Sequence, residues 1–136
     1  MASQKKSDKL KRLVAVQRHM ERMAETDLGV TAQRIEENAQ SMEMVMEAIG
    51  SLEPVHRLFA QNYADRFDRL SNTDRQLHGL QQVQEMKLLR ERAKGDRLEE
   101  NRKEARALEE RQSDDDAIYD LIDIRFATPA SSKLGE

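Results

Sequence analysis

The sequence contains no cysteine, no tryptophan, two prolines and five glycines among its 136 residues. The lack of cysteine excludes disulfide bonds, cysteine-ligated zinc and thiol nucleophiles, and it fits a reducing compartment. Aromatic residues make up only 4% of the chain and hydrophobic residues 38%, which is little material for the core of a compact globule. No apolar run approaches the roughly eighteen residues that a membrane span requires.

Charged residues make up 36% of the chain, but the net charge is only −3. No overall electrostatic attraction to nucleic acid follows from so small a charge. The N-terminus lacks the apolar stretch of a signal peptide. We therefore expect a cytoplasmic protein with no nucleic-acid partner and no integral membrane segment; peripheral attachment at the cytoplasmic face of the inner membrane is the alternative.

Residues 10–52 carry apolar side chains at every third or fourth position, the spacing of a stripe on one face of an α-helix. High charge is also typical of disordered chains, but such chains seldom keep a stripe in phase for this length. A long helix with one apolar edge needs a partner helix. The predicted stripe is Leu10, Leu13, Val16, Met20, Ala24, Leu28, Thr31, Ile35, Ala39, Met42, Val45 or Met46, Ile49 and Leu52. It steps by four twice around Ala24, which predicts a stutter in the coiled coil.

Gly50-Ser51-Leu52-Glu53-Pro54 is the strongest interruption of this pattern. Gly50 can close a helix in the left-handed conformation, Ser51 can cap the next helix, and Pro54 fits its first turn. A kink here, with the reversal at 71–74, is the alternative. The reversal at Gly50 places Gly29 near Gly79, which indicates a close backbone approach, a soft joint, or two unrelated glycines.

The second stripe starts at Val55, Leu58 and Phe59, and its apolar character fades into alternating charges after Leu89. Its further members are Tyr63, Phe67, Leu70, Leu77, Leu80, Gln84, Leu88, Glu91, Gly95, Leu98, Arg102, Ala105 and Leu108. Ser113 and the three aspartates after it read either as a new helix start or as a charged part of a longer helix. An amphipathic segment follows, and residues 127–136 read as a disordered tail.

The fold class expected from these patterns is all-α: an elongated antiparallel two-helix coiled-coil hairpin. Residues 1–126 form one domain, with arm one over about 8–50, capped by Ser7, a turn at about 50–54, arm two over about 54–112 and a short C-terminal amphipathic helical segment at 113–126.

Nothing in the sequence predicts a reaction. The glycines are isolated, so there is no phosphate-binding loop, and the three histidines do not have metal-ligand spacing. The carboxylates lie on solvated faces, without an apolar pocket that would raise a pKa. We therefore expect no catalytic residue, no metal and no cofactor, and hence no enzyme.

Three groups of residues are candidates for binding a protein partner. A basic N-terminal block suits an acidic partner or Asp114–Asp116 of the same chain, although it also suits a merely solubilising helix start. Met44 lies off the main stripe, and methionine adapts to irregular partner surfaces. The C-terminal segment suits docking as an amphipathic helix; the alternative is that it folds back on the hairpin or simply extends it. The candidate residues are Lys5, Lys6, Lys9, Arg12, Met44, Ile118, Tyr119, Leu121, Ile122 and Phe126.

The layout of the chain resembles a known family. Lys9-Leu10-Lys11-Arg12-Leu13-Val14 runs from a basic block into a leucine-rich seam, and Lys87-Leu88-Leu89-Arg90-Glu91-Arg92 begins a charged late helix with an aspartate-rich end. This is similar to the stalk protein of the bacterial flagellar and type III secretion export apparatus, the FliJ/YscO-like family. The resemblance implies an antiparallel coiled coil in or near the pore of the hexameric export ATPase, with contacts to the export gate and to chaperones or their substrates.

Two other functions fit the same patterns. A small helical-hairpin export chaperone would shield a secreted subunit, with 118–126 forming part of an apolar groove. A homodimeric coiled-coil scaffold without a hairpin would place the stripe between two copies, so a homo-oligomer is the alternative to a monomer.

Overall fold

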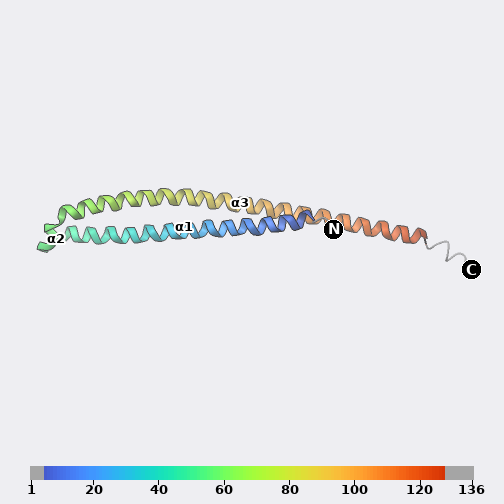
Figure 1. Cartoon of the computed structure of the whole chain (residues 1–136), viewed down its shortest axis with the longest axis horizontal. Coiled ribbons are helices and arrows are strands. Elements are labelled where there is room, and N and C mark those ends of the chain that lie inside the picture. The colour runs from blue at the N-terminus through green and yellow to red at the C-terminus, as the bar shows by residue number, and fades with distance from the viewer. Residues whose placement is uncertain (1–4, 128–136) are drawn as a thin grey trace, which may run out of the picture. The chain divides into compact units, whose positions relative to one another are not determined.

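The computed structural model describes residues 5–127 and contains three helices: α1 (Lys6–Gly50), α2 (Pro54–Leu58) and α3 (Ala60–Ala127) (Figure 1). Helix α1 packs against α3, which confirms the all-α antiparallel hairpin. A coiled-coil scaffold without a hairpin is therefore wrong as an arrangement of this chain. Of the predicted tail, Ala127 is the last residue of α3, and 128–136 lie outside the described residues.

The chain divides into two units, and each unit contains a part of α1 and a part of α3. One unit is Gln17–Lys94, which includes the turn. The other combines Met1–Val16 with Gly95–Glu136, of which 5–16 and 95–127 are described. We call them the turn unit and the terminal unit.

The chain reverses at the predicted turn, because α1 ends at Gly50 and Pro54 opens α2. Gly50 does not have a positive φ, so the expected left-handed closure is wrong. The N-cap of α2 is Glu53 rather than Ser51, and it has the extended backbone that proline imposes on the residue before it. The alternative reversal at 71–74 lies inside α3.

Arm two begins with a break, which the sequence pattern did not predict. Helix α2 ends after one turn, and Phe59, with φ −105° and ψ 16°, separates it from α3. Val55, Leu58 and Phe59 are exposed, so the predicted start of the second stripe is wrong. The contacts between the arms begin at Tyr63, which is the first partly buried residue of α3.

The seam of α1 in the turn unit repeats every seven residues without a stutter. Its buried positions are Gln17, Ala24, Thr31, Asn38 and Val45. Between them lie Glu21, Leu28, Ile35 and Met42, which are buried or partly buried. The alternating three- and four-residue steps are those of a regular left-handed coiled coil.

The seam of α3 has the same spacing, and it matches most of the predicted second stripe. In the turn unit it consists of Tyr63, Phe67, Leu70, Asp74, Leu77, Gln81, Gln84, Leu88 and Glu91. Two contacts fix the register of the two helices. Asn38 Nδ2 donates to the Leu70 carbonyl oxygen at 2.9 Å, and Gln17 Nε2 donates to the Glu91 carbonyl oxygen at 3.0 Å.

Part of the predicted stripe of α1 lies outside the seam. Leu13, Val16, Met20, Ile49 and Leu52 are exposed, and so is Ala39. Polar residues take the neighbouring inward positions, because Gln17 and Asn38 satisfy their amides by hydrogen bonds to α3. A buried polar group that is hydrogen-bonded costs little, so hydrophobicity alone chose the wrong face of α1 at these positions.

Gly29 and Gly79 are exposed, and a Cβ atom added at either position would meet no atom within 4 Å. The close backbone approach is therefore wrong.

Replacing Gly29 or Gly79 by alanine is expected to raise the free energy of unfolding by about 1 kcal/mol each, because alanine loses less backbone entropy in a helix. Chemical denaturation of the two variants measures the change. A loss of stability in either variant would indicate that the glycine is needed for packing.

In the terminal unit, the beginning of α1 lies along the later part of α3, with Leu10, Val14, Leu98 and Ala105 buried or partly buried. Helix α3 passes through Ser113–Asp116 without a break. The prediction that a new helix starts at Ser113 is therefore wrong. These residues are a charged part of the longer helix α3, which was the alternative.

Candidate partner-binding site

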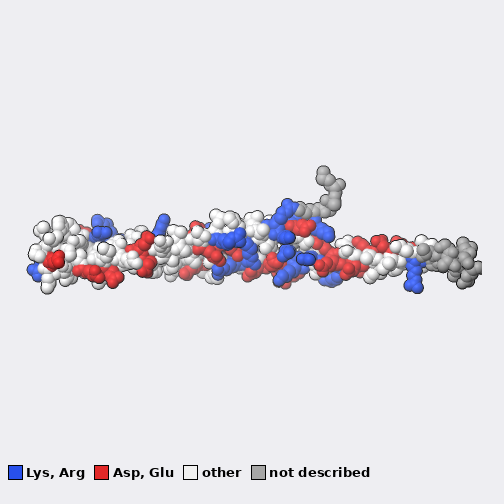
Figure 2. All heavy atoms as spheres, turned by 90° about the horizontal axis from the view of Figure 1, so that it is seen from below, with Lys and Arg blue, Asp and Glu red and all other residues white. Residues whose placement is uncertain are grey.

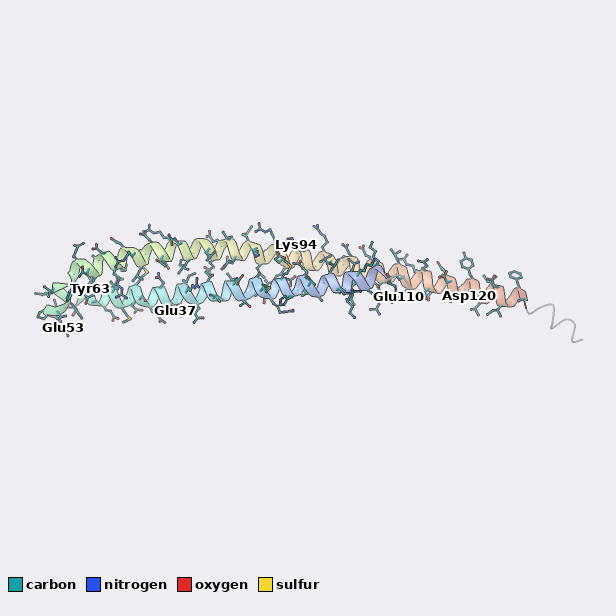
Figure 3. The ribbon with its side chains drawn as sticks, viewed as in Figure 1. Glu37, Glu53, Tyr63, Lys94, Glu110 and Asp120 are labelled. Carbon is teal, nitrogen blue, oxygen red and sulfur yellow. The ribbon has the colours of Figure 1, made fainter. Side chains whose placement is uncertain are left out.

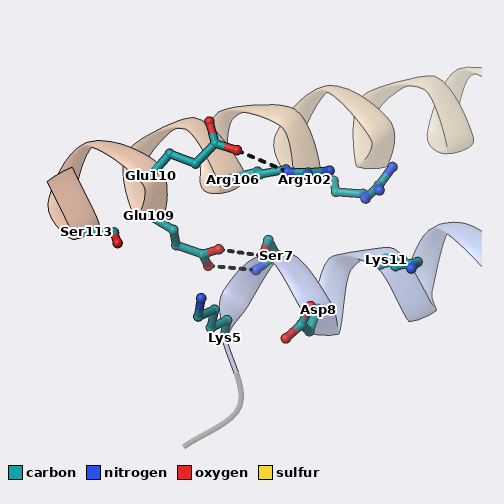
Figure 4. Close-up of a pocket in the computed structure, with 9 residues that line it drawn as sticks. All are labelled: Lys5, Ser7, Asp8, Lys11, Arg102, Arg106, Glu109, Glu110 and Ser113. Atoms are coloured by element: carbon teal, nitrogen blue, oxygen red, sulfur yellow. Dashed lines mark hydrogen bonds and ion pairs between the residues drawn. The ribbon is translucent and has the colours of Figure 1, made fainter.

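The first turn of α1 is capped by a side chain of α3. Lys5 precedes the helix, and its carbonyl oxygen accepts the N–H groups of Asp8 and Lys9 at 3.1 and 3.2 Å. Ser7, the predicted cap, lies within the helix instead. Its N–H donates to Glu109 Oε1 at 3.0 Å, and its hydroxyl donates to Glu109 Oε2 (Figure 4). Because the first N–H groups of a helix have no partner within the helix, Glu109 caps α1 from the other helix.

This cap places a carboxylate at the positive end of the α1 dipole. The hydrogen bonds from the Ser7 hydroxyl and N–H lower the pKa of Glu109 from its ordinary value of 4.5, and the charge of Lys5 acts in the same direction. The balancing anion at the basic N-terminus is therefore Glu109, which the sequence analysis missed, rather than Asp114–Asp116. Its signal was the heptad phase: Glu109 lies one heptad after Arg102 in the seam, next to the exposed Leu108 that the pattern favoured.

Acid is expected to loosen the terminal unit. Since the pKa of Glu109 is lower in the folded state, its carboxylate stabilises the fold fully above about pH 4.5, and this contribution is lost as the pH falls through the lowered pKa. Thermal melts between pH 7 and pH 3 should therefore show a difference between the native chain and Glu109→Gln that shrinks with falling pH. A constant difference would contradict the cap.

The predicted basic residues Lys5, Lys6, Lys9 and Arg12 are all exposed in the terminal unit. Acidic side chains lie among them, and Figure 2 shows blue and red atoms intermixed around the N-terminal end of α1. A hollow of about 480 Å³ has both signs of charge in its lining. Its lining residues are Lys5, Ser7, Asp8, Lys11, Arg102, Arg106, Glu109, Glu110 and Ser113 (Figure 4).

Lys9 and Arg12 have a different setting from Lys5. They line a shallow hollow of about 300 Å³ together with Leu13 and Val16, whose side chains are 51% and 59% exposed. This part of α1 therefore presents two cations beside two apolar side chains, which is a surface for an amphipathic partner rather than for a simple polyanion.

The C-terminal part of α3, which we call the extension (Glu110–Ala127), is exposed at every residue. Figure 3 shows it continuing as a single helix, with Glu110 and Asp120 labelled on it. The predicted residues lie here with these exposed fractions: Ile118 55%, Tyr119 66%, Leu121 66%, Ile122 42% and Phe126 80%. Folding back of this segment onto the hairpin is therefore wrong, and the other alternative, that the segment simply extends the helix, is what the structure contains.

The extension is also acidic on its remaining surface. Five aspartates and two arginines lie between 110 and 127. Asp116 and Asp120 line a hollow that also includes Lys5 and Glu109. Asp116 and Asp120 lie opposite the apolar face, whereas Asp114 and Asp115 lie one turn before Ile118 on the same side of the helix. A helix with this pattern fits insertion into a groove with an apolar floor and a basic rim.

Met44, the remaining candidate, belongs to the turn unit, whereas the other nine belong to the terminal unit. It is 69% exposed, and it lines a hollow of about 190 Å³ with Ser41, Val45, Ala48, Tyr63 and Arg66. Its position off the seam is as the sequence predicts.

A polar pair inside the seam of the turn unit was also missed as a pair. Gln17 Nε2 donates to both the carbonyl oxygen and the carboxylate of Glu91, and this bond lowers the pKa of Glu91, with Lys94 adding to the effect. Glu91 belongs to the predicted second stripe, but Gln17 is not in the predicted stripe of α1, which followed apolar side chains. The sequence analysis therefore did not predict this pair.

The chain matches no protein-family model, no curated protein and no solved structure. Within residues 5–127, no group of three or more metal-ligating side chains is placed to hold an ion. No helix of the described part of the chain is both long and apolar enough to cross a membrane.

Proposed function

We propose that this protein is a non-enzymatic coiled-coil stalk or adaptor of the flagellar or type III export apparatus, located in the cytoplasm. It joins protein partners: the export ATPase ring, the export gate, or export chaperones and their substrates. The observation that carries the proposal is the extension, an amphipathic helix that continues beyond the paired part of the terminal unit with all its side chains exposed.

The rest of the terminal unit supports a mechanical role. The Ser7–Glu109 contact fastens the beginning of α1 to α3 immediately before the extension begins. A helix that emerges from a capped, paired segment is held at its base, so its apolar face is presented in a defined direction. Such preorganisation lowers the entropic cost of binding. The layout of the sequence, described above, is what assigns this adaptor to the export apparatus.

A chaperone that shields a secreted subunit is the second candidate, and it needs an apolar groove. Two hollows of the terminal unit are lined largely by charged and hydroxyl side chains. Two others include apolar side chains, but no more than three each, and charged side chains line these hollows as well. The extension presents an exposed ridge of apolar side chains instead. A ridge inserts into the groove of another protein, which favours the adaptor over the chaperone.

The test is capture of purified partners by the immobilised full chain. We expect retention of the export ATPase or of the cytoplasmic part of the export gate, but no retention of secreted flagellar subunits presented alone. Retention of the subunits without the ATPase or the gate would favour the chaperone, and retention of none of the three would refute both functions.

A further inference from the structure

The terminal unit has a groove along one side of the hairpin that the proposed function does not use. A hollow of about 360 Å³ lies between the two helices there, and Leu10 of α1 lines it together with Ala105 and Leu108 of α3. The shallow hollow beside Leu13 and Val16 of α1 is the second part of this surface. We call these five apolar residues the side groove.

The two hollows lie on the same side of α1. Lys6 lines the first hollow and Leu13 lines the second, and residues one heptad apart share a side of a coiled-coil helix. The groove is open to solvent, because Leu13, Val16 and Leu108 are 51%, 59% and 61% exposed. It is therefore an unoccupied surface for a third helix alongside α1 and α3.

Cations outnumber carboxylates around the side groove. Glu104 lines the first hollow, and the same side of α3 also carries the residues one turn and one heptad before it. Glu109 lines this hollow too, but its carboxylate is bonded to Ser7. The other charged residues on this side are the cations Lys6, Lys9, Arg12 and Arg97 and the carboxylates Glu100 and Glu104. A helix that binds here with its apolar face should therefore be acidic.

The extension is an acidic helix of this kind. Between 114 and 126 it carries five aspartates and one arginine. Asp114 and Asp115 lie one turn before Ile118, on the side of the helix that carries the apolar face. When this face lies in a groove, these two carboxylates meet the rim, and the other three aspartates add a longer-range attraction to the same cations.

The order of charged and apolar residues along the extension matches the order along α1. Both begin with charged residues, acidic in the extension and basic in α1, and continue with apolar ones at the same spacing. A constant difference of 108 in residue number pairs Asp114 with Lys6, Ile118 with Leu10 and Leu121 with Leu13. Opposite charges meet and apolar side chains meet only if the two helices run in the same chain direction.

The extension of the same chain is not the helix that fills the groove, because it continues α3 without a break beyond the first residue of α1. We propose that two copies of this chain associate through their terminal units, with the extension of each copy in the side groove of the other. A two-fold axis perpendicular to the hairpin gives this arrangement, since it reverses the direction of α3. The extension of one copy then runs along α1 of the other in the same chain direction, as the order of charges requires.

The association itself does not depend on the export partner, but its consequence rests on the proposed function. The second copy covers the same apolar face of the extension that binds the partner, so the partner must displace the second copy. Melting temperatures of extension variants report on the fold of one chain only below the dissociation constant, where the protein is monomeric.

The first test is sedimentation of the full chain over a range of concentrations. The native chain is expected to be a dimer at high concentration and a monomer on dilution. Leu13→Glu should raise the dissociation constant roughly a hundredfold, because it places a carboxylate against an acidic helix twice in the symmetric dimer.

The matched control is Ala15→Glu. Ala15 is exposed and lies two positions from Leu13, and therefore on the opposite side of α1. This variant should dissociate at the same concentration as the native chain, and circular dichroism should show equal helicity for all three. A native chain that is monomeric at every concentration, or equal dissociation of the two variants, would overturn the proposal.

The second test uses the absence of cysteine from the chain. Chains with Leu13→Cys are mixed under mild oxidation with chains that carry Leu121→Cys and a size tag, so that a disulfide between the two positions joins two copies. We expect the mixed dimer in high yield, and little of it from Ala15→Cys with the same tagged chain. Comparable yields from the two mixtures would overturn the arrangement. Both tests use the chain without an export partner, so failure here is distinguishable from failure of partner capture.

Discussion

Replacing Val45 by aspartate is expected to lower the free energy of unfolding of the turn unit by about 2–4 kcal/mol, because it buries a carboxylate in the seam. Pairing with Arg66, which lines the same hollow, offsets only part of the desolvation cost. Val45 is 4% exposed, and it lies with Tyr63 and Arg66 around one hollow. Single domains are stable by only about 5–15 kcal/mol, so a large part of the stability is lost. Thermal and chemical denaturation followed by circular dichroism measure the effect.

The control for Val45→Asp is its neighbour. Met46 is 60% exposed, so Met46→Asp introduces the same charge one residue further along the same helix without burying it. We expect a change within about 0.5 kcal/mol for this variant, as for surface substitutions in general. Equal losses in the two variants would mean that the seam of α1 does not run through Val45. Ile35→Asp, at another seam position, should resemble Val45→Asp.

Replacing both Ile118 and Ile122 by serine is expected to weaken capture of the export partner by a hundredfold or more without lowering the melting temperature. Both side chains are exposed on the extension, at 55% and 42%, so the fold does not depend on them. Buried in a partner's groove, each isoleucine would contribute about 1.5–3 kcal/mol. Quantitative capture of the ATPase or gate by the variant measures the loss.

The matched control for this double variant is Asp116→Ser with Asp120→Ser, which changes two exposed residues of the same extension that each lie two positions from Ile118 and therefore on the opposite side of the helix. It should retain binding to within severalfold. Unchanged capture by the isoleucine variant would remove the extension from the binding site, and a lowered melting temperature would show that its apolar face packs within the protein.

The helical class, the reversal near Gly50 and most of the α3 seam could be predicted from the sequence, because these features depend on apolar periodicity and on proline. The inward face of α1 between Leu13 and Met20 could not be predicted from the sequence. There the apolar residues form two stripes of comparable strength, and periodicity does not say which one faces the other arm. Asn38 and Gln17 determine which face of α1 points inward, because their amides donate hydrogen bonds to backbone oxygens of α3. A sequence pattern does not show these acceptors.

Part of the candidate partner-binding site could also be predicted from the sequence, and part could not. Ile118, Ile122 and Phe126 could be picked out from the sequence, because an amphipathic stretch after a polar helix is visible there. The three side chains are exposed, and their role in docking stays a prediction. The role of Glu109 could not be predicted from the sequence, because it depends on which residue of α3 reaches the first turn of α1.

The Ser7–Glu109 contact joins residues 102 positions apart in the chain, whereas the two arms next to the turn are neighbours in sequence. Closing a long loop costs more entropy than closing a short one. We therefore expect the contacts between the arms to form first next to the turn, and the contact of Ser7 with Glu109 to form last. The same order holds in reverse: fluctuations that open the molecule begin at Ser7 and Glu109, directly before the extension. A partner that binds the extension therefore acts next to the part of the hairpin that opens most easily. Acid protonates Glu109 and lowers the free energy needed to open this part.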